Sequence, residues 1–140
     1  MAYWLVKTEP DAFSWADQVA RGPAGEPWTG VRNHQAKAHL LAMRVGDAAL
    51  FYHTGGEKQA VGIVRVVREA YPDPTDPDGG FVCVDVAAEQ ALARPVPLAA
   101  VKADPRLAQM ALVRLSRLSV QPVTPAEWAV MLALGGLGEA

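Results

Sequence analysis

Glycine and proline interrupt this chain so often that short secondary-structure elements are expected throughout. The 140 residues include 12 glycines and 11 prolines. They gather at residues 22–27 and 72–80, and Pro10 closes the first apolar segment. Because proline lacks the N–H that a helix or a sheet ladder requires, each cluster predicts a turn or a loop. The chain should therefore fold into short strands and helices joined by tight connections.

Five segments have the composition of β-strands. They are rich in β-branched and aromatic residues, and their apolar residues alternate with a period of two. Within residues 47–54, for example, Leu50 and Tyr52 share one face, while Phe51 and His53 share the other. The expected strands are residues 3–7, 47–54, 60–68, 81–86 and 111–120, with a hairpin loop at residues 55–58.

Helical patterns lie between and after these strands. Asn33 is a favourable N-cap, and Ala36, Leu40 and Met43 follow on one face of an amphipathic helix. The sequence Thr-Pro-Ala-Glu at residues 124–127 forms a capping box with proline at the first helical position. The expected helices are residues 11–19, 35–44 and 125–134, with one or two further helical turns within residues 95–109.

Together these elements predict a single α+β domain over residues 1–140. Five or six strands form a strongly twisted mixed β-sheet, either open or closed into a β-barrel, surrounded by short helices. Hydrophobic residues make up 51% of the chain, which supplies a substantial core and excludes intrinsic disorder of the whole.

Charge and cysteine content exclude several classes of protein. Thirteen basic and 15 acidic residues give a formal net charge of −2, so a nucleic-acid site would have to be a local patch. The single Cys83 excludes an internal disulfide and a cysteine-based zinc cluster, and it fits a reducing compartment. No apolar run approaches the roughly 20 residues that cross a bilayer, and residues 1–7 lack a signal-peptide pattern. We therefore expect a cytoplasmic protein without membrane contact. The abundance of alanine and the excess of arginine over lysine are typical of bacteria with GC-rich genomes, so we also expect a bacterial protein.

Signatures of catalysis and of cofactor or metal binding are absent from the sequence. The chain has no phosphate-binding glycine loop, no dinucleotide fingerprint and no nucleophile elbow. His34, His39 and His53 lack the spacing of metal ligands. The aspartates of residues 73–78 lack the terminal glutamate of a calcium loop. We therefore expect no catalytic residue, no cofactor and no metal.

Two polar clusters flank apolar segments and have two interpretations each. Lys7 and Thr8, at the end of the first strand, either donate hydrogen bonds to a phosphate or base, or form a solvated turn. Ser116-Arg117-Leu118-Ser119 lies within an expected strand, where Arg117 shares a face with aliphatic residues. Arg117 therefore needs a partner, which is either an acidic side chain or an anionic ligand.

A third cluster, residues 28–33, directly precedes a helix. Trp28 offers a stacking face, Gly30 permits close approach of a ligand, and Arg32 adds positive charge beside the helix N-terminus. In the alternative interpretation Trp28 fills the core, Asn33 only caps the helix, and Arg32 pairs with an acid.

Four collinear motifs resemble those of the EVE domain family. They are Tyr3-Trp4-Leu5-Val6-Lys7-Thr8-Glu9-Pro10, Trp28-Thr29-Gly30-Val31-Arg32-Asn33, Phe51-Tyr52-His53 and Ser116-Arg117-Leu118-Ser119-Val120-Gln121-Pro122-Val123. The resemblance runs from Met1 to about Leu134. Each motif alone is modest evidence, but four in the same order are highly specific.

This resemblance implies a PUA-like fold and the recognition of a modified base, chiefly modified cytosine in DNA, by flipping into an aromatic-walled pocket. Lys7 and Thr8 would then meet the pocket, and Trp28 would be one wall. The remaining parts of the implied site are the rim (Gly30, Val31, Arg32, Asn33), the opposite side (Phe51, Tyr52, His53) and the floor or phosphate contacts (Ser116, Arg117, Leu118, Ser119).

Three functions remain open at this point. The first is a non-enzymatic reader that binds nucleic acid carrying a modified base, with DNA favoured over RNA. The second is an enzyme acting on a nucleotide or small molecule, with Lys7, His53 or Ser116 as proton-transfer groups. The third is a protein-interaction module, which would lack a concave site. The reader requires a hollow beside Trp28, and an indole sealed inside the core would exclude it.

Overall fold

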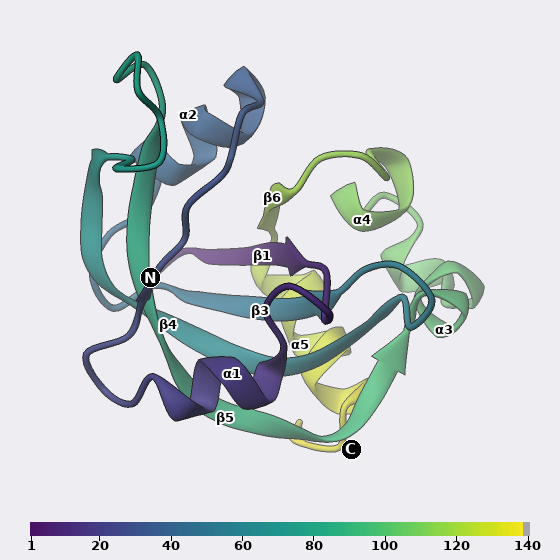
Figure 1. Cartoon of the computed structure of the whole chain (residues 1–140). Helices are drawn as coiled ribbons and strands as arrows, with labels where there is room; N and C mark the ends of the chain where they lie inside the picture. Colours follow the sequence, from purple (N-terminus) through teal and green to yellow (C-terminus); the bar gives the residue numbers. More distant parts are fainter. Residues whose placement is uncertain (139–140) are drawn as a thin grey trace.

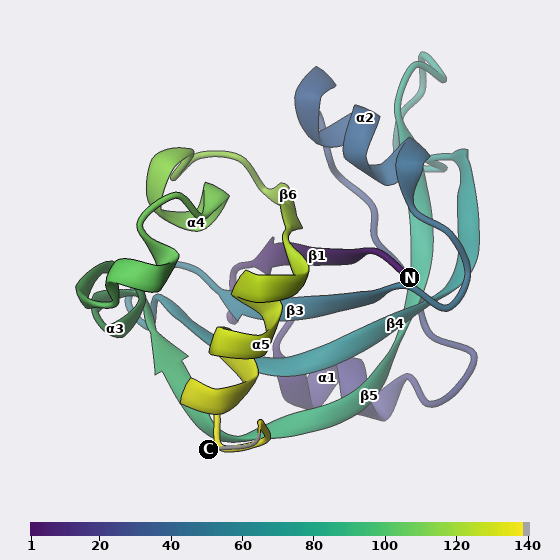
Figure 2. The same cartoon turned by 180° about the vertical axis from the view of Figure 1, so that it is seen from behind.

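The computed structural model describes residues 1–138 and shows a curved six-stranded sheet with helices on both faces (Figure 1; Figure 2). The strands are β1 (Tyr3–Thr8), β2 (Glu26–Pro27), β3 (Ala48–His53), β4 (Gln59–Pro72), β5 (Val82–Pro97) and β6 (Val120–Val123). The helices are α1 (Trp15–Ala20), α2 (His34–Ala42), α3 (Leu98–Ala103), the 3₁₀ turn η1 (Pro105–Leu107), α4 (Ala111–Arg114) and α5 (Pro125–Leu134).

The sheet is mixed and open. Its strand order is β2-β5-β4-β3-β1-β6, and β2 and β6 are its two free edges. β1 runs parallel to β3, whereas the other paired strands are antiparallel. The expectation of a twisted mixed sheet is therefore confirmed, and the sheet is open rather than closed into a barrel. Among the helices of residues 1–138, none combines the length and the apolar content that crossing a membrane requires.

Strand alternation divides the core into two layers, one on each face of the sheet. Trp4, Val6 and Phe51 belong to the layer beneath α1 and α2. Leu5 and Leu50 point the opposite way, into the layer that α5 covers with its own apolar face (Figure 2). Because residues adjacent in a strand point to opposite faces, β1 and β3 connect the two layers.

The helix caps predicted from sequence are confirmed. The Asn33 side chain accepts a hydrogen bond from the Ala36 N–H, and Ala36, Leu40 and Met43 are fully buried on the inner face of α2. Thr124 and Glu127 form the capping box of α5. These short-range signals position the two helices that cover opposite faces of the sheet.

The expected strand over residues 111–120 is wrong. Residues 111–114 form the single-turn helix α4, residues 115–119 form a loop, and only β6 is a strand. The buried Gln121 side chain stabilises this loop by donating hydrogen bonds to the carbonyls of Leu115 and Leu118, at 3.0 and 2.9 Å. One helical turn is too short for the 3.6-residue repeat to be distinguished from strand alternation.

Strands β4 and β5 are longer than expected, and β2 was not expected. Register shifts between β4 and β5 interrupt the alternation that would reveal their full length. β2 pairs only with Asp85 and Val86, so the later part of β5 is an edge, where Pro95 and Pro97 are tolerated. Residues 95–97, expected to belong to a loop with one or two helical turns over residues 95–109, are therefore the end of β5, and the helical turns α3 and η1 follow them.

Candidate functional site

A cavity of about 270 Å³ opens beside Trp28. Trp28 is 7% exposed, so its indole lies mostly in the core but still contributes to the cavity wall. The volume lies just below the roughly 300 Å³ at which pockets for drug-sized ligands begin, which suits a smaller planar molecule. The residues lining the cavity are Lys7, Thr8, Ala12, Phe13, Arg21, Glu26, Pro27, Trp28 and Thr29.

The indole of Trp28 is held rigidly from behind. Its backbone N–H donates to the Val84 carbonyl at 2.7 Å, which continues the pairing of β2 with β5. Phe51 and Phe13 each meet the indole edge-on at 80°, with ring centroids 5.6 and 6.2 Å away. Edge-to-face contacts of this kind are favourable, and they fix the orientation of the wall before any ligand arrives.

Lys7 and Thr8 reach the cavity because they end strand β1. The Thr8 hydroxyl donates to the Phe13 carbonyl at 2.9 Å and so ties the chain before α1 to the rim. Lys7 Nζ donates to the Ser116 carbonyl at 2.8 Å and lies 5.9 Å from the centre of the Tyr52 ring. Burial lowers the pKa of Lys7. Among residues 1–138, no carboxylate lies within ion-pair distance of this ammonium group.

The segment from Gly30 to Asn33 is organised by the buried carboxylate of Asp73. Its oxygen Oδ2 accepts from the Gly30 N–H at 2.8 Å and from Arg32 Nη1 at 3.1 Å. Oδ1 accepts from both the N–H and the hydroxyl of Thr75, each at 2.7 Å. Burial alone would raise the pKa of Asp73, but these hydrogen bonds outweigh it and hold the pKa at about 2. Asp73 is therefore ionised at neutral pH.

Arg32 thus has an acidic partner, and Asn33 caps α2, as the alternative interpretation of this cluster stated. Val31 is 6% exposed and anchors the segment in the core. None of Gly30, Val31 and Arg32 lines the cavity itself. The segment connects Trp28 to α2, and its rigidity comes from Asp73.

A second hollow, of about 280 Å³, lies on the other side of Lys7. It is lined by Asn33, Gln35, Leu115, Ser116, Arg117 and Leu118. Lys7 joins it to the cavity, because Lys7 Nζ binds the Ser116 carbonyl and the Lys7 N–H donates to the Ser119 carbonyl at 3.0 Å. The structure therefore brings residues of all three clusters predicted from sequence to these two neighbouring hollows.

Arg117 lies in an exposed loop rather than on a strand face. Within the described part of the chain it has neither an ion-pair partner nor a side-chain hydrogen bond. The prediction of an aliphatic face around Arg117 is wrong, because residues 115–119 do not alternate as a strand. Its guanidinium is available to an anion.

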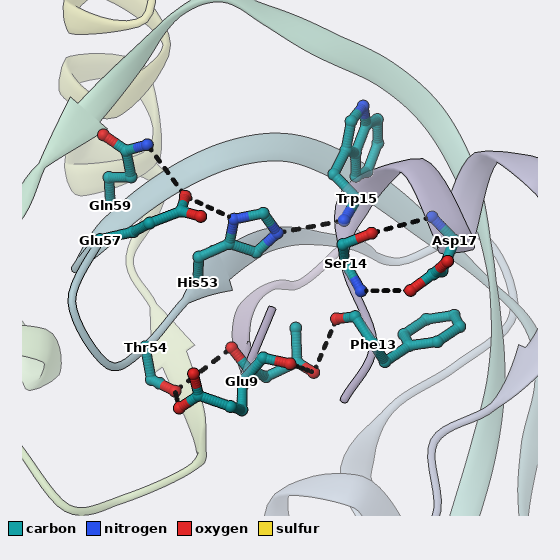
Figure 3. A network of polar contacts seen from close by, with 10 residues as sticks. Glu9, Phe13, Ser14, Trp15, Asp17, His53, Thr54, Glu57 and Gln59 are labelled. Atoms are coloured by element: carbon teal, nitrogen blue, oxygen red, sulfur yellow. Dashed lines mark hydrogen bonds and ion pairs between the residues drawn. The ribbon is translucent and has the colours of Figure 1, made fainter. Parts of the chain in front are cut away.

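Phe51, Tyr52 and His53 are not brought to the wall of the cavity. Phe51 lies beneath Trp28, and Tyr52 is buried in the opposite core layer. His53 Nε2 accepts from the Trp15 N–H at 3.0 Å, so Nδ1 carries the proton that binds Glu57 at 2.8 Å (Figure 3). This hydrogen bond is the main cause of a lowered pKa of Glu57. His53 thus fixes the start of α1.

Several cavity residues were not singled out from the sequence. Arg21 and Glu26 form an ion pair at 2.9 Å, and the Arg21 guanidinium lies 5.4 Å from the centre of the Phe13 ring. Glu26 reaches the cavity because β2 pairs with β5. This pairing is a long-range contact, and a strand of only two residues has no sequence pattern from which it could be predicted. Phe13 carries a weak sequence signal, since an aromatic residue beside Pro10 suggests local packing.

The described residues contain no group of three or more His, Cys, Asp and Glu side chains that would hold a metal ion. Cys83 is fully buried in β5, where it lies between Val82 and Val84. The wall of the cavity offers groups for hydrogen bonding, stacking and charge, among them Thr8, Trp28 and the Arg21–Glu26 pair.

Comparisons with known proteins agree on one family. The EVE domain model matches residues 2–134. The chain is 33% identical to thymocyte nuclear protein 1 of Homo sapiens, over 95% of this chain and 73% of that protein. The structure of Rpa0253 from Rhodopseudomonas palustris is similar, with 61% identity and a TM-score of 0.94 over 100% of this chain and 97% of the other.

A further solved structure is human THYN1 protein in complex with 5-methylcytosine-containing DNA. It has 32% identity and a TM-score of 0.87, over 96% of this chain and 98% of the other. The α+β, PUA-like architecture expected from the sequence is confirmed by these likenesses. The four motifs and the family match cover the same residues, and the chain belongs to the EVE domain family.

Proposed function

We propose that this protein is a non-enzymatic reader of a modified nucleobase, with modified cytosine in DNA as its target. The base would leave the duplex and occupy the cavity beside Trp28. The observation that carries the proposal is this cavity, whose wall contains the indole of Trp28 and the polar residues Thr8, Arg21 and Glu26. The complex of human THYN1 protein with 5-methylcytosine-containing DNA supports the choice of ligand.

The energetics favour an enclosed base. Flipping a nucleotide costs a few kcal/mol in lost stacking and pairing. Stacking on an aromatic side chain returns about 1–3 kcal/mol per base, and hydrogen bonds from polar residues of the cavity wall would offset the remainder. Arg117, in the second hollow joined to the cavity by Lys7, would contact the phosphate of the flipped nucleotide or its neighbour.

The arrangement does not favour the enzyme alternative. A general base must come within hydrogen-bond reach of the proton that it abstracts. His53 lies outside the cavity wall, and both of its ring nitrogens are engaged, by Trp15 and Glu57. Ser116 lines the second hollow rather than the cavity. A concave site also argues against a simple protein-interaction module.

The experiment is a titration of labelled duplexes that contain one central cytosine or one 5-methylcytosine, followed by fluorescence anisotropy. We expect tighter binding of the methylated duplex by about tenfold, the scale on which a pocket recognises one methyl group. RNA of the same sequence should bind more weakly. Equal binding of all duplexes, or no binding, would reject the proposal.

Variants connect this binding to the cavity. Lys7→Met keeps most of the apolar stem but removes the donor, so it should weaken binding of the methylated duplex. Lys102→Met removes an exposed lysine of α3, away from both hollows, and should bind as the wild type does. Mass analysis of the oligonucleotide after incubation tests the enzyme alternative, since a reader returns its ligand unchanged.

A further inference from the structure

The carboxylate of Glu26 is an unexpected component of a cavity proposed to receive part of a polyanion. Its side chain is 30% exposed and lies in the cavity wall together with Lys7 and Trp28. Oε1 accepts a hydrogen bond from Arg21 Nε at 2.9 Å, while Oε2 accepts none from residues 1–138. An ion pair this exposed contributes little to stability, so holding Arg21 does not by itself account for the carboxylate.

Lys7 also lines the cavity, but its ammonium group points to the other side of the sheet. Lys7 pairs with Tyr52, and Lys7 Nζ lies 5.9 Å from the centre of the Tyr52 ring, which belongs to the core layer opposite Trp28. Nζ donates to the carbonyl of Ser116, a residue of the second hollow. The oxygen Oε2 of Glu26 is therefore a free polar group of the cavity wall that this ammonium group does not neutralise.

We propose that Glu26 reads the amino group on the hydrogen-bonding edge of the flipped base and so distinguishes cytosines from thymine. This inference rests on the proposed function. Cytosine carries an amino donor at N4 beside an acceptor at N3, and a carboxylate is a suitable acceptor for that amino group. The free oxygen Oε2 of Glu26 is then satisfied.

Thymine reverses this pattern. Its O4 is an acceptor and would face the carboxylate of Glu26. Two acceptors that face each other have no proton to share, so both are desolvated without a partner, and this disfavours the wrong ligand.

The distinction has a chemical consequence for a reader of methylated DNA. Thymine is 5-methyluracil, so it carries the same C5 methyl group as 5-methylcytosine and differs only at the edge of the ring. Any preference between these two bases therefore measures edge reading, and not recognition of the methyl group. The same preference also separates 5-methylcytosine from thymine, which is the product of its hydrolytic deamination.

The test compares duplexes with 5-methylcytosine or thymine at one position, each opposite an abasic site so that the two bases lose no pairing on flipping. The wild type should bind 5-methylcytosine more tightly. Glu26→Gln replaces the carboxylate by an amide of the same shape that both donates and accepts. It should reduce the ratio of the two affinities by at least about fivefold, the lower end for one correctly paired base contact.

Arg21→Met is the matched control. It breaks the same ion pair but keeps the Glu26 carboxylate, so the preference for 5-methylcytosine should persist even where affinity changes. If Glu26→Gln and the wild type share one ratio, or if Arg21→Met loses the preference to the same extent, edge reading by Glu26 is refuted. Failure of the wild type to bind any duplex would instead refute the proposed function. Thermal unfolding of each variant confirms that the fold is retained.

Discussion

Replacing Asp73 by asparagine should destabilise the protein by about 2 kcal/mol at neutral pH. The carboxylate is buried and accepts four hydrogen bonds, from Gly30, Arg32 and Thr75. These contacts lower the pKa of Asp73 from 3.8 to about 2, against the opposing effect of burial. At about 1.36 kcal/mol per pKa unit, this difference corresponds to about 2 kcal/mol of stabilisation of the folded state.

The pH dependence follows from the direction of the shift. Because the folded protein holds Asp73 at a lower pKa than the unfolded chain does, the stabilisation is complete above the unfolded pKa, near pH 4. It is lost progressively as the pH falls from about 4 through 2, and it vanishes only below the folded pKa, where the carboxylate is protonated in both states. The gap in the free energy of unfolding between the wild type and Asp73→Asn should therefore narrow in that range.

Urea denaturation followed by tryptophan fluorescence, repeated between pH 7 and pH 3, measures this gap. Asp78→Asn is a matched control, because Asp78 is an exposed aspartate of the same loop. It should change the free energy of unfolding by less than about 0.5 kcal/mol, as surface substitutions do. If the two variants are equally stable at pH 7, or if the gap for Asp73 does not depend on pH, the reasoning is refuted.

Three further predictions concern other parts of the chain. Gly62→Ala should cost about 1–3 kcal/mol in urea denaturation, because the new Cβ would lie 2.5 Å from the ring of Trp15; Gly56→Ala, in open space, should not show this loss. Thr124→Ala should cost about 1 kcal/mol in the same assay by removing the N-cap of α5, and an unchanged midpoint would contradict the capping argument. Arg117→Gln should reduce the magnitude of the negative slope of log K against log salt concentration by about one, and an unaltered slope would show that Arg117 contacts no phosphate.

Elements with strong local signals could be predicted from the sequence. The caps at Asn33 and Thr124 act within three or four residues, so the chain itself contains the whole interaction. The side chains of β1 and β3 alternate between two faces, and because both faces are apolar in sequence, the pattern indicates directly that both are buried. Phe51 and Tyr52 do lie on opposite sides of the sheet, as predicted.

The composition of the cavity could not be predicted in the same way. Glu26 enters the wall only because a two-residue strand pairs with Val86, which is 60 positions away along the chain. Asp73 acts on Gly30 and Arg32 across a similar separation. For Arg117, the local pattern was ambiguous between a helical turn and a strand, and Gln121 decides it by binding the carbonyls of the loop.

The charge distribution explains how an acidic chain can still bind DNA in the proposed manner. Arg21, Arg32, Arg65 and Arg106 each have a carboxylate partner, which leaves them less available to phosphate. The basic groups that line the two hollows without an acidic partner in residues 1–138 are Lys7 and Arg117. Two phosphate contacts would supply a salt slope of only about −2, far from that of proteins that bind DNA mainly through its backbone.

Under the proposed function, affinity would then come largely from the base in the cavity, because among the described residues only two cations without an acidic partner line the two hollows. A protein that depends on the base in this way gains little from unmodified DNA, which limits competition from the large excess of ordinary sequence. The negative net charge opposes non-specific association and so increases the contrast between a marked base and its surroundings. Weak attraction to the backbone is thus consistent with the proposed reading of a single base, for which the cavity beside Trp28 would supply most of the affinity and the selectivity.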